Sequence, residues 1–176
     1  MRKRLRDGIF EEFARNYDIL CLSETYLQHL NMSETNLHNY SFLIKEKSLA
    51  SHKFGGVHGL GMLVKNSLIN HAKVINETQS PYALWVKFGK EAFGIPCIVG
   101  SLYLPGENSI HKDKDMFDVL TDDILAMKNS FDLPLCLIGD LNSRTGNLDD
   151  SFVIEQSVIN SWGSMTLLKS FFLIRP

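Results

Sequence analysis

Two polar residues that could carry chemistry follow an apolar run late in the chain. The run Pro134–Ile138 and the adjacent Gly139 lead directly to Asp140 and Asn142, which stand two positions apart. About four to eight apolar residues ended by glycine are typical of a buried strand, and alternate side chains of a strand point the same way. Strand ends are where α/β folds bind ligands. Because Asp, Asn and Gly also favour turns, a plain turn is the alternative interpretation.

Two other apolar runs also end in polar side chains. Asp18–Ser23 ends at Glu24, and Pro96–Tyr103 ends at the phenol of Tyr103. Carboxylate, phenol and amide groups together make an oxygen-rich set, which suits Mg²⁺ or Mn²⁺ rather than zinc. Phosphoryl transfer needs a metal that neutralises charge, a group that orients the attacking water, and donors for the phosphate oxygens. The residue types match these roles.

The elements that must position these residues follow from hydrophobic periodicity. Apolar residues recur at helical spacing over 3–16 and from about 112 to 129, and a further helix is expected to begin near 166–168. The middle of the chain holds several strands with no helices between them, which favours helices packed on sheets, an α/β (α+β) fold, over a purely parallel doubly wound one. The expected strands are 18–23, 40–45, 62–64, 73–75, 83–88, 96–103 and 134–139.

Composition limits the class of protein. With 176 residues the chain is one domain or part of a larger one. A net charge of −2 gives no global basic field, so a nucleic-acid binder would depend on a local patch such as Arg2–Arg6, for which a solvated helix face is the alternative.

Cys21, Cys97 and Cys136 lie in apolar stretches without paired spacing, which indicates reduced core thiols. We therefore expect a soluble intracellular protein, nuclear or cytoplasmic, neither secreted nor in contact with a membrane.

Four short blocks follow one another along the chain: Leu22–Thr25; Gly55–Val57 followed by Met62–Lys65; Tyr103–Pro105; and Gly139–Asn142. In this order they resemble the LQET, GGV and VK, YxP and GDFN blocks of the endonuclease/exonuclease/phosphatase superfamily. The later segments Ser143–Gly146, Ser161–Gly163 and Leu167–Leu168 look most like the endonuclease domain of non-LTR retrotransposons.

The resemblance implies a fold, a reaction and a role for each residue. The fold would be a partial four-layered α/β sandwich, in which two mixed sheets are flanked by helices. Glu24 would bind Mg²⁺ or Mn²⁺, and Tyr103 would orient the scissile phosphate. Asp140 would orient and deprotonate the attacking water, while Asn142 would position Asp140 and contact the phosphate. DNA would be the substrate, and a reverse transcriptase domain in the parent reading frame is among the implied partners.

Simpler interpretations stand beside these roles. Glu24 could be a surface carboxylate, and Tyr103 a core aromatic at a strand end. Lys65 and Arg144 fit contacts with DNA phosphates and a solvated surface equally well. Four further residues are assigned to the surface or the core rather than to the site: His58, His111, Trp85 and Trp162.

The chain departs from the family pattern at both ends. The family's first strand, with its Asn-containing block, has no counterpart before the helix that begins the chain. Its late Ser-Asp-His block is also missing, because no His follows His111 and no Asp follows Asp150. We therefore expect residues 1–176 to form a single incomplete domain that lacks the first strand and the C-terminal part. Unpaired sheet edges and a weak or inactive site would follow.

Three functions remain open from the sequence. The first is a divalent-metal-dependent DNA endonuclease, weak or inactive in this form. The second is a degenerate, non-catalytic domain with residual metal or nucleic-acid binding. The third is a phosphatase or phosphodiesterase of the same superfamily.

Overall fold

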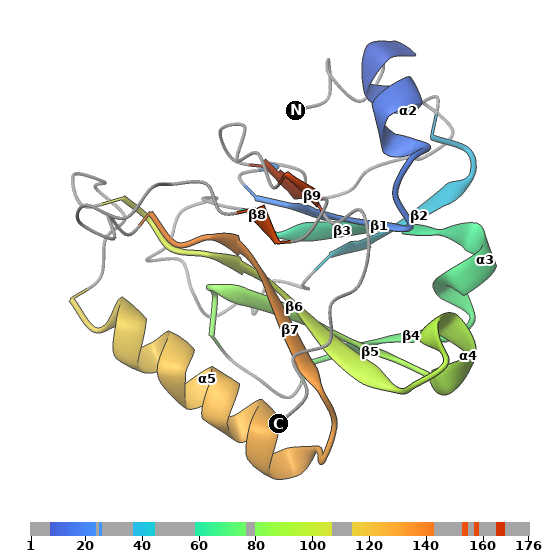
Figure 1. The fold of residues 1–176 in the computed structure, drawn as a ribbon. Helices are drawn as coiled ribbons and strands as arrows, with labels where there is room; N and C mark the ends of the chain where they lie inside the picture. Colours follow the sequence, from blue (N-terminus) through green and yellow to red (C-terminus); the bar gives the residue numbers. More distant parts are fainter. Residues whose placement is uncertain are drawn as a thin grey trace.

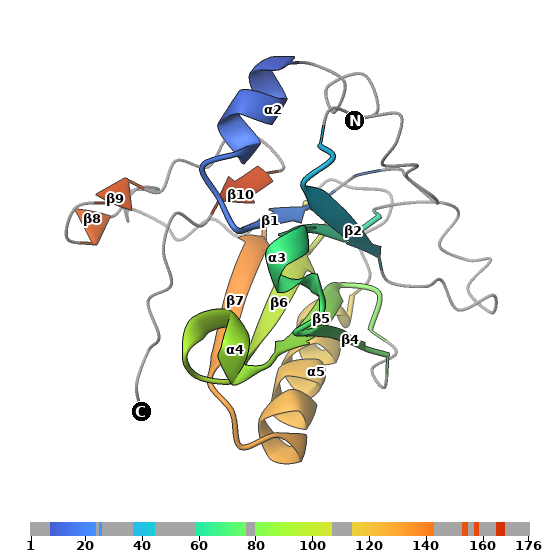
Figure 2. The ribbon, with the colours of Figure 1, turned by 90° about the vertical axis from the view of Figure 1, so that its right-hand side faces the viewer.

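The computed structural model of the chain describes residues 8–23, 25, 37–44, 59–76, 80–106 and 114–142, together with the backbone of 153–154, 157–158 and 165–167. Within these residues two four-stranded sheets lie face to face, and helices cover their outer faces (Figures 1 and 2). The mixed α/β class and the two sheets flanked by helices confirm the fold predicted from the sequence.

The first sheet is antiparallel throughout. It contains β1 (Ile19–Leu22), β2 (Tyr40–Ile44), β3 (Gly61–Lys65) and β10 (Met165–Leu167), in the order β10-β1-β3-β2. Every residue of β1 is buried, as expected for the apolar run that precedes Glu24. The helix α2 (Gly8–Ala14) covers the outer face of this sheet (Figure 1).

The second sheet is mixed. Its strands β4 (Ala72–Ile75), β5 (Ala83–Phe88), β6 (Cys97–Tyr103) and β7 (Leu135–Asp140) follow one another in that order. The first three are antiparallel, whereas β6 and β7 run parallel because helix α5 (Met116–Ser130) crosses over between them. Two short helices, α3 (Asn66–Ile69) and α4 (Lys90–Phe93), and a hairpin of β8 (Val153–Ile154) and β9 (Ser157–Val158) complete the described elements.

Alternation along the strands of the second sheet separates two cores. In β6, Val99 and Tyr103 belong to the core between the two sheets, whereas Ile98 and Leu102 belong to the core beneath α5. A smaller core lies between α2 and the first sheet. The order of layers is therefore α2, first sheet, second sheet, α5 (Figure 1).

The core beneath α5 contains a buried polar contact. Trp85 is fully buried, which confirms its prediction as a core residue, and its Nε1 donates a hydrogen bond to Asp123 Oδ2 at 3.2 Å. Asp123 is 8% exposed, so this hydrogen bond partly offsets the cost of burying its carboxylate.

The cysteine prediction is also confirmed. Cys21 and Cys97 are buried, Cys136 is half-buried, and all three are free thiols. Within the described part of the chain, no helix has the length and apolar character needed to cross a bilayer.

Some local expectations were wrong. Thr166 and Leu167, expected to begin a helix, pair as a strand with Cys21 and Leu20 of β1. Sequence analysis also missed α3 and α4, which have four residues each. Such short helices carry too little periodicity to be recognised.

Candidate active site

The parallel pairing of β6 and β7 brings Tyr103 and Asp140 together. They are partners in the register, although α5 separates them along the chain. The ladder continues one step further, where the Leu104 N–H donates to the Asp140 carbonyl oxygen at 2.9 Å. Ile138, two residues before Asp140, faces the core between the sheets. By alternation the Asp140 side chain shares this face with Tyr103.

The backbone turns sharply immediately after Asp140. The Asn142 N–H donates to Asp140 Oδ1 at 2.9 Å, and Asn142 adopts a φ of 46°, a left-handed conformation that asparagine tolerates. The Asn142 Nδ2 donates to the Leu104 carbonyl oxygen at 2.7 Å. The predicted strand and the turn are both present, but the strand was wrongly expected to be buried: Ile138 alone in β7 is buried, and Leu137 is exposed. The β7 strand has β6 on one side and no neighbour on its other side among the described strands of its sheet.

The Leu104 peptide is held on both sides by the segment that carries Asp140. Its N–H bonds the Asp140 backbone, and its carbonyl oxygen bonds the Asn142 side chain. The Leu104 side chain is fully buried in the core beneath α5. The end of β7 is thus tied to a peptide that the core anchors, and the half-buried Asp140 carboxylate gains a fixed direction.

Tyr103 is buried, with 6% of its surface exposed, and it belongs to the core between the sheets. Its N–H donates to the Tyr82 carbonyl oxygen at 3.0 Å. Burial agrees with the interpretation of Tyr103 as a core aromatic at a strand end. Its role toward a phosphate stays a prediction.

The fourth predicted site residue, Glu24, lies outside the described residues, so its role as a metal ligand also stays a prediction. Thr25, the next residue, donates from both its N–H and its Oγ to the Gly59 carbonyl oxygen, at 2.9 Å in each case. Among the described residues, no three His, Cys, Asp or Glu side chains gather in a way that could hold a metal ion. The other candidates outside the described residues are His58, His111, Arg144, Trp162 and the Arg2–Arg6 segment.

The thiols in the two sheets are held in their neutral form. Burial raises the pKa of Cys21 to about 12, against a hydrogen bond with Ser101 that lowers it. Burial likewise raises the pKa of Cys97 to about 11, and it raises the pKa of Cys136. Thiols that stay protonated are poor nucleophiles and poor metal ligands, so we assign these residues to the core.

Sequence analysis missed two contributors to this site. Leu104 acts through its backbone, which no side-chain pattern reveals. Gly139 was noted as the end of an apolar run and as part of the block that resembles GDFN, without a role of its own, yet a Cβ there would lie 1.9 Å from the Leu102 carbonyl oxygen. A glycine placed immediately before the candidate base was the available signal.

Comparisons with known proteins agree with this fold. A family model described as the Endonuclease/Exonuclease/phosphatase family matches residues 2–164. Among solved structures, the chain is similar to the human Nocturnin catalytic domain with bound sulfate anion, with a TM-score of 0.51 and 17% identity. The alignment covers 81% of this chain and 57% of that one, and at this identity the likeness shows the fold alone. Comparison with curated proteins gives no match.

Proposed function

The chain belongs to the endonuclease/exonuclease/phosphatase family, and we propose that it is a divalent-metal-dependent hydrolase domain that cleaves DNA phosphodiester bonds weakly. The observation that carries the proposal is the joining of Tyr103, Asp140 and Asn142 at the ends of β6 and β7. Strand ends of this kind are where catalytic groups of α/β folds lie.

Asp140 is the proposed general base. Its Oδ1 accepts the Asn142 N–H at 2.9 Å, and within the described residues no hydrogen bond reaches its Oδ2. In the proposed step Oδ2 takes a proton from water while the water oxygen bonds to phosphorus. The bond from phosphorus to the 3′ oxygen breaks, which leaves a 5′-phosphate and, after protonation, a 3′-hydroxyl.

Asn142 and Tyr103 complete the proposed site. The Asn142 amide, held by the Leu104 carbonyl oxygen, fixes the turn that aims Asp140. Tyr103 would orient the phosphate from the neighbouring strand.

The oxygen-donor character of this set fits a hard cation such as Mg²⁺ or Mn²⁺, which Glu24 would hold. The cation would supply charge neutralisation at the phosphate.

DNA as substrate, and a retrotransposon-type parent with a reverse transcriptase domain, are proposed from the residues after Asn142. Ser143–Gly146 and Ser161–Gly163 resemble the corresponding endonuclease segments.

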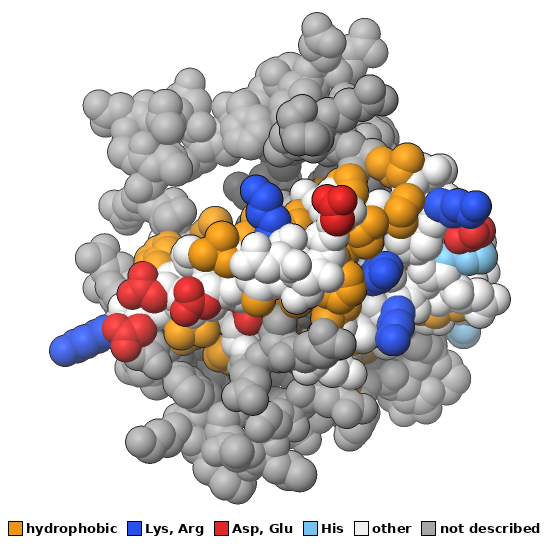
Figure 3. Space-filling view, turned by 90° about the horizontal axis from the view of Figure 1, so that it is seen from below, with side chains coloured by type: hydrophobic (Ala, Val, Ile, Leu, Met, Phe, Trp, Pro, Cys, Tyr) orange, Lys and Arg blue, Asp and Glu red, His pale blue; other side chains and the backbone are white. Residues whose placement is uncertain are grey.

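Electrostatics favour approach from one side. Acidic side chains gather toward one end of the face in Figure 3. On α5, Asp118 and Asp122 are exposed. A polyanion is repelled there, so we expect DNA to meet the site from the side of the first sheet.

A specific observation supports a second candidate, the non-catalytic domain. Within residues 1–176 no His follows His111 and no Asp follows Asp150, so the Asp-His pair of the family pattern is not among these residues. Loss of one member of a catalytic unit removes most of its rate enhancement. For that reason we propose slow hydrolysis rather than full activity.

The deciding experiment is nicking of supercoiled plasmid by the purified chain in Mg²⁺, beside Asp140→Asn. We expect slow, metal-dependent nicking that falls about 10²- to 10⁴-fold in Asp140→Asn, because a general base contributes on this scale. Asp118→Asn is the matched control, since it removes the same charge from an exposed helical position.

The other outcomes also decide between functions. A folded chain that binds Mg²⁺ or DNA without nicking would support the non-catalytic domain. Hydrolysis of a phosphate monoester or of a smaller phosphodiester, with none of DNA, would support the phosphatase alternative.

A further inference from the structure

Gly139 makes the closest backbone approach among the described glycines. A Cβ built there would lie 1.9 Å from the Leu102 carbonyl oxygen, 2.6 Å from its carbonyl carbon and 2.8 Å from its Cα. These atoms belong to the backbone of the neighbouring strand, so the collision cannot be relieved by rotating a side chain. Any residue larger than glycine must push β6 and β7 apart.

The backbone of β6 has little freedom to yield. Leu102 pairs with Gly139 on one side and with Ala83 of β5 on the other. Its side chain is 3% exposed and lies in the core beneath α5. The displacement must therefore fall on β7, which has no partner on its other side among the described strands of its sheet.

The collision point coincides with the candidate site. Leu102 and Gly139 immediately precede Tyr103 and Asp140, which are the next pair in the register. One step further, the Leu104 N–H bonds the Asp140 carbonyl oxygen at 2.9 Å. A strand pushed away at Gly139 would thus carry Asp140 away from both partners.

We propose that Gly139 is a positioning residue for hydrolysis: the absence of a side chain lets β7 approach β6 closely enough to hold Asp140 beside Tyr103 and against the Leu104 peptide. This inference rests on the proposed function for its catalytic consequence. Its geometric consequence, the closure of β6 on β7, does not depend on activity.

The test compares three glycine-to-alanine variants. Gly139→Ala should lower kcat for DNA hydrolysis per folded molecule about 10- to 100-fold with little change in KM, because misplacement by about 1 Å costs this much. Gly100→Ala is the control for stability, since its Cβ would meet the Trp85 ring at 2.4 Å, away from the site. Gly106→Ala is the control for the site's surroundings, where the Cβ would make an ordinary contact of 3.6 Å with Asn142.

Amide hydrogen exchange gives a readout that does not require hydrolysis. In Gly139→Ala the Leu104 and Asn142 amides should lose protection, whereas in Gly100→Ala they should stay as protected as global stability allows. Wild-type protection and wild-type kcat in a folded Gly139→Ala protein would overturn the proposal. If the wild-type chain does not hydrolyse DNA, the proposed function fails, while the exchange result still decides whether Gly139 lets β7 close on β6.

If the Gly139→Ala protein does not fold, amide exchange in the wild-type protein provides the test. The Leu104 amide should then exchange only through global unfolding, at the rate of the buried Val99 amide. Faster, local exchange at Leu104 would show that β7 is not held against β6 and would refute the inference.

Discussion

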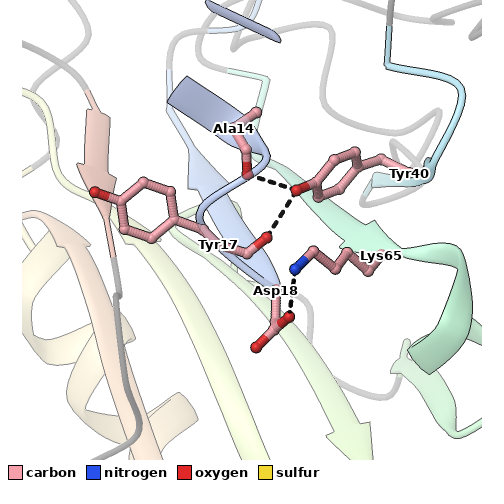
Figure 4. Close-up of polar contacts among 5 residues, drawn as sticks. All are labelled: Ala14, Tyr17, Asp18, Tyr40 and Lys65. Atoms are coloured by element: carbon pink, nitrogen blue, oxygen red, sulfur yellow. Dashed lines mark hydrogen bonds and ion pairs between the residues drawn. The ribbon is translucent and has the colours of Figure 1, made fainter. Parts of the chain in front are cut away.

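The two ends of the sandwich use similar polar groups in opposite ways. Figure 1 shows β1, β6 and β7 ending on one side of the molecule, with α3 and α4 on the other. At the α3 end, the Tyr40 hydroxyl lies 2.5 Å from the Ala14 carbonyl oxygen and 2.7 Å from that of Tyr17 (Figure 4). Lys65 Nζ lies 2.7 Å from Asp18 Oδ1 beside them. Here the side chains are used to close the end of α2 onto the first sheet.

At the opposite end, hydrogen bonds aim a side chain rather than enclose it. The Asp140 carboxylate accepts a single hydrogen bond among the described residues, at Oδ1, and Asp140 remains half-buried. Tyr40, by contrast, is 4% exposed, and burial together with the charge of Asp18 raises its pKa. The difference teaches that the α3 end contributes stability, whereas the other end is built to leave a carboxylate available. Substitutions should separate the two properties.

The largest expected effect comes from a matched pair of tyrosines. Tyr40→Phe should lower the free energy of unfolding by about 0.5–1.5 kcal/mol, because it removes the hydroxyl shared by the Ala14 and Tyr17 carbonyl oxygens, of which the Ala14 oxygen keeps the Tyr17 N–H. Hydrolysis per folded molecule should not change. Tyr103→Phe should instead lower hydrolysis, because its phenol is proposed to orient the phosphate. Urea denaturation and plasmid nicking measure the two effects.

The opposite assignment of the two effects, stability and hydrolysis, would contradict the comparison. If Tyr103→Phe cost only stability and Tyr40→Phe only activity, the candidate site would be at the wrong end. Tyr82→Phe provides a third buried tyrosine as the reference for loss of a phenol elsewhere.

A second expectation concerns the loss of stability at alkaline pH that Cys21, in the core between the two sheets, should cause. The pKa of Cys21 is raised from 9.0 to about 12 in the folded chain, so its contribution to stability is complete below pH 9 and is lost as pH rises toward 12. At pH 10 the loss should be about 1 kcal/mol.

Cys21→Ala should flatten the fall in unfolding free energy between pH 8 and about pH 10.5, as measured by urea denaturation at each pH. The absolute stability of the variant is not the readout, because a cavity lowers it at every pH. Equal slopes for wild type and Cys21→Ala would show that this thiol is not protected as described. Cys136→Ala, at a half-buried thiol, serves as the comparison.

The smallest effect should come from the ion pair at the α3 end. Asp18 and Lys65 side chains are 60% and 31% exposed, and exposed pairs contribute at most about 1 kcal/mol. Lys65→Met should therefore lower stability slightly in low salt and less in high salt. Lys73→Met, at an exposed strand position, is the control. A large loss of nicking in Lys65→Met would revive the phosphate contact considered for this residue.

Long periodic elements were predictable from the sequence, and contacts that depend on register were not. Helix α5 repeats Met116, Leu120 and Met127 on its buried face, so its pattern alone revealed it. Thr166 and Leu167 lie in a run that fits a helix, but pairing with β1 places them in a strand. Short apolar runs cannot be separated by pattern when a distant strand decides their conformation.

The candidate site likewise has features that the sequence pattern predicts and features that depend on strand register. Residue types and strand ends made Tyr103, Asp140 and Asn142 candidates, because each stands where an apolar run stops. The turn closed by the Asp140 carboxylate and the contact at Gly139 require the alignment of β6 with β7, which only the folded chain sets. Glu24 stays a prediction.

The unit β6–α5–β7 supplies Tyr103, Asp140 and Asn142 from one uninterrupted stretch of chain. Such a stretch is inherited as a block, so related chains that keep this unit keep all three residues in their mutual arrangement. The presence of the unit therefore records descent and does not by itself measure catalysis. Catalysis depends also on residues from other stretches of the chain, such as the proposed metal ligand Glu24.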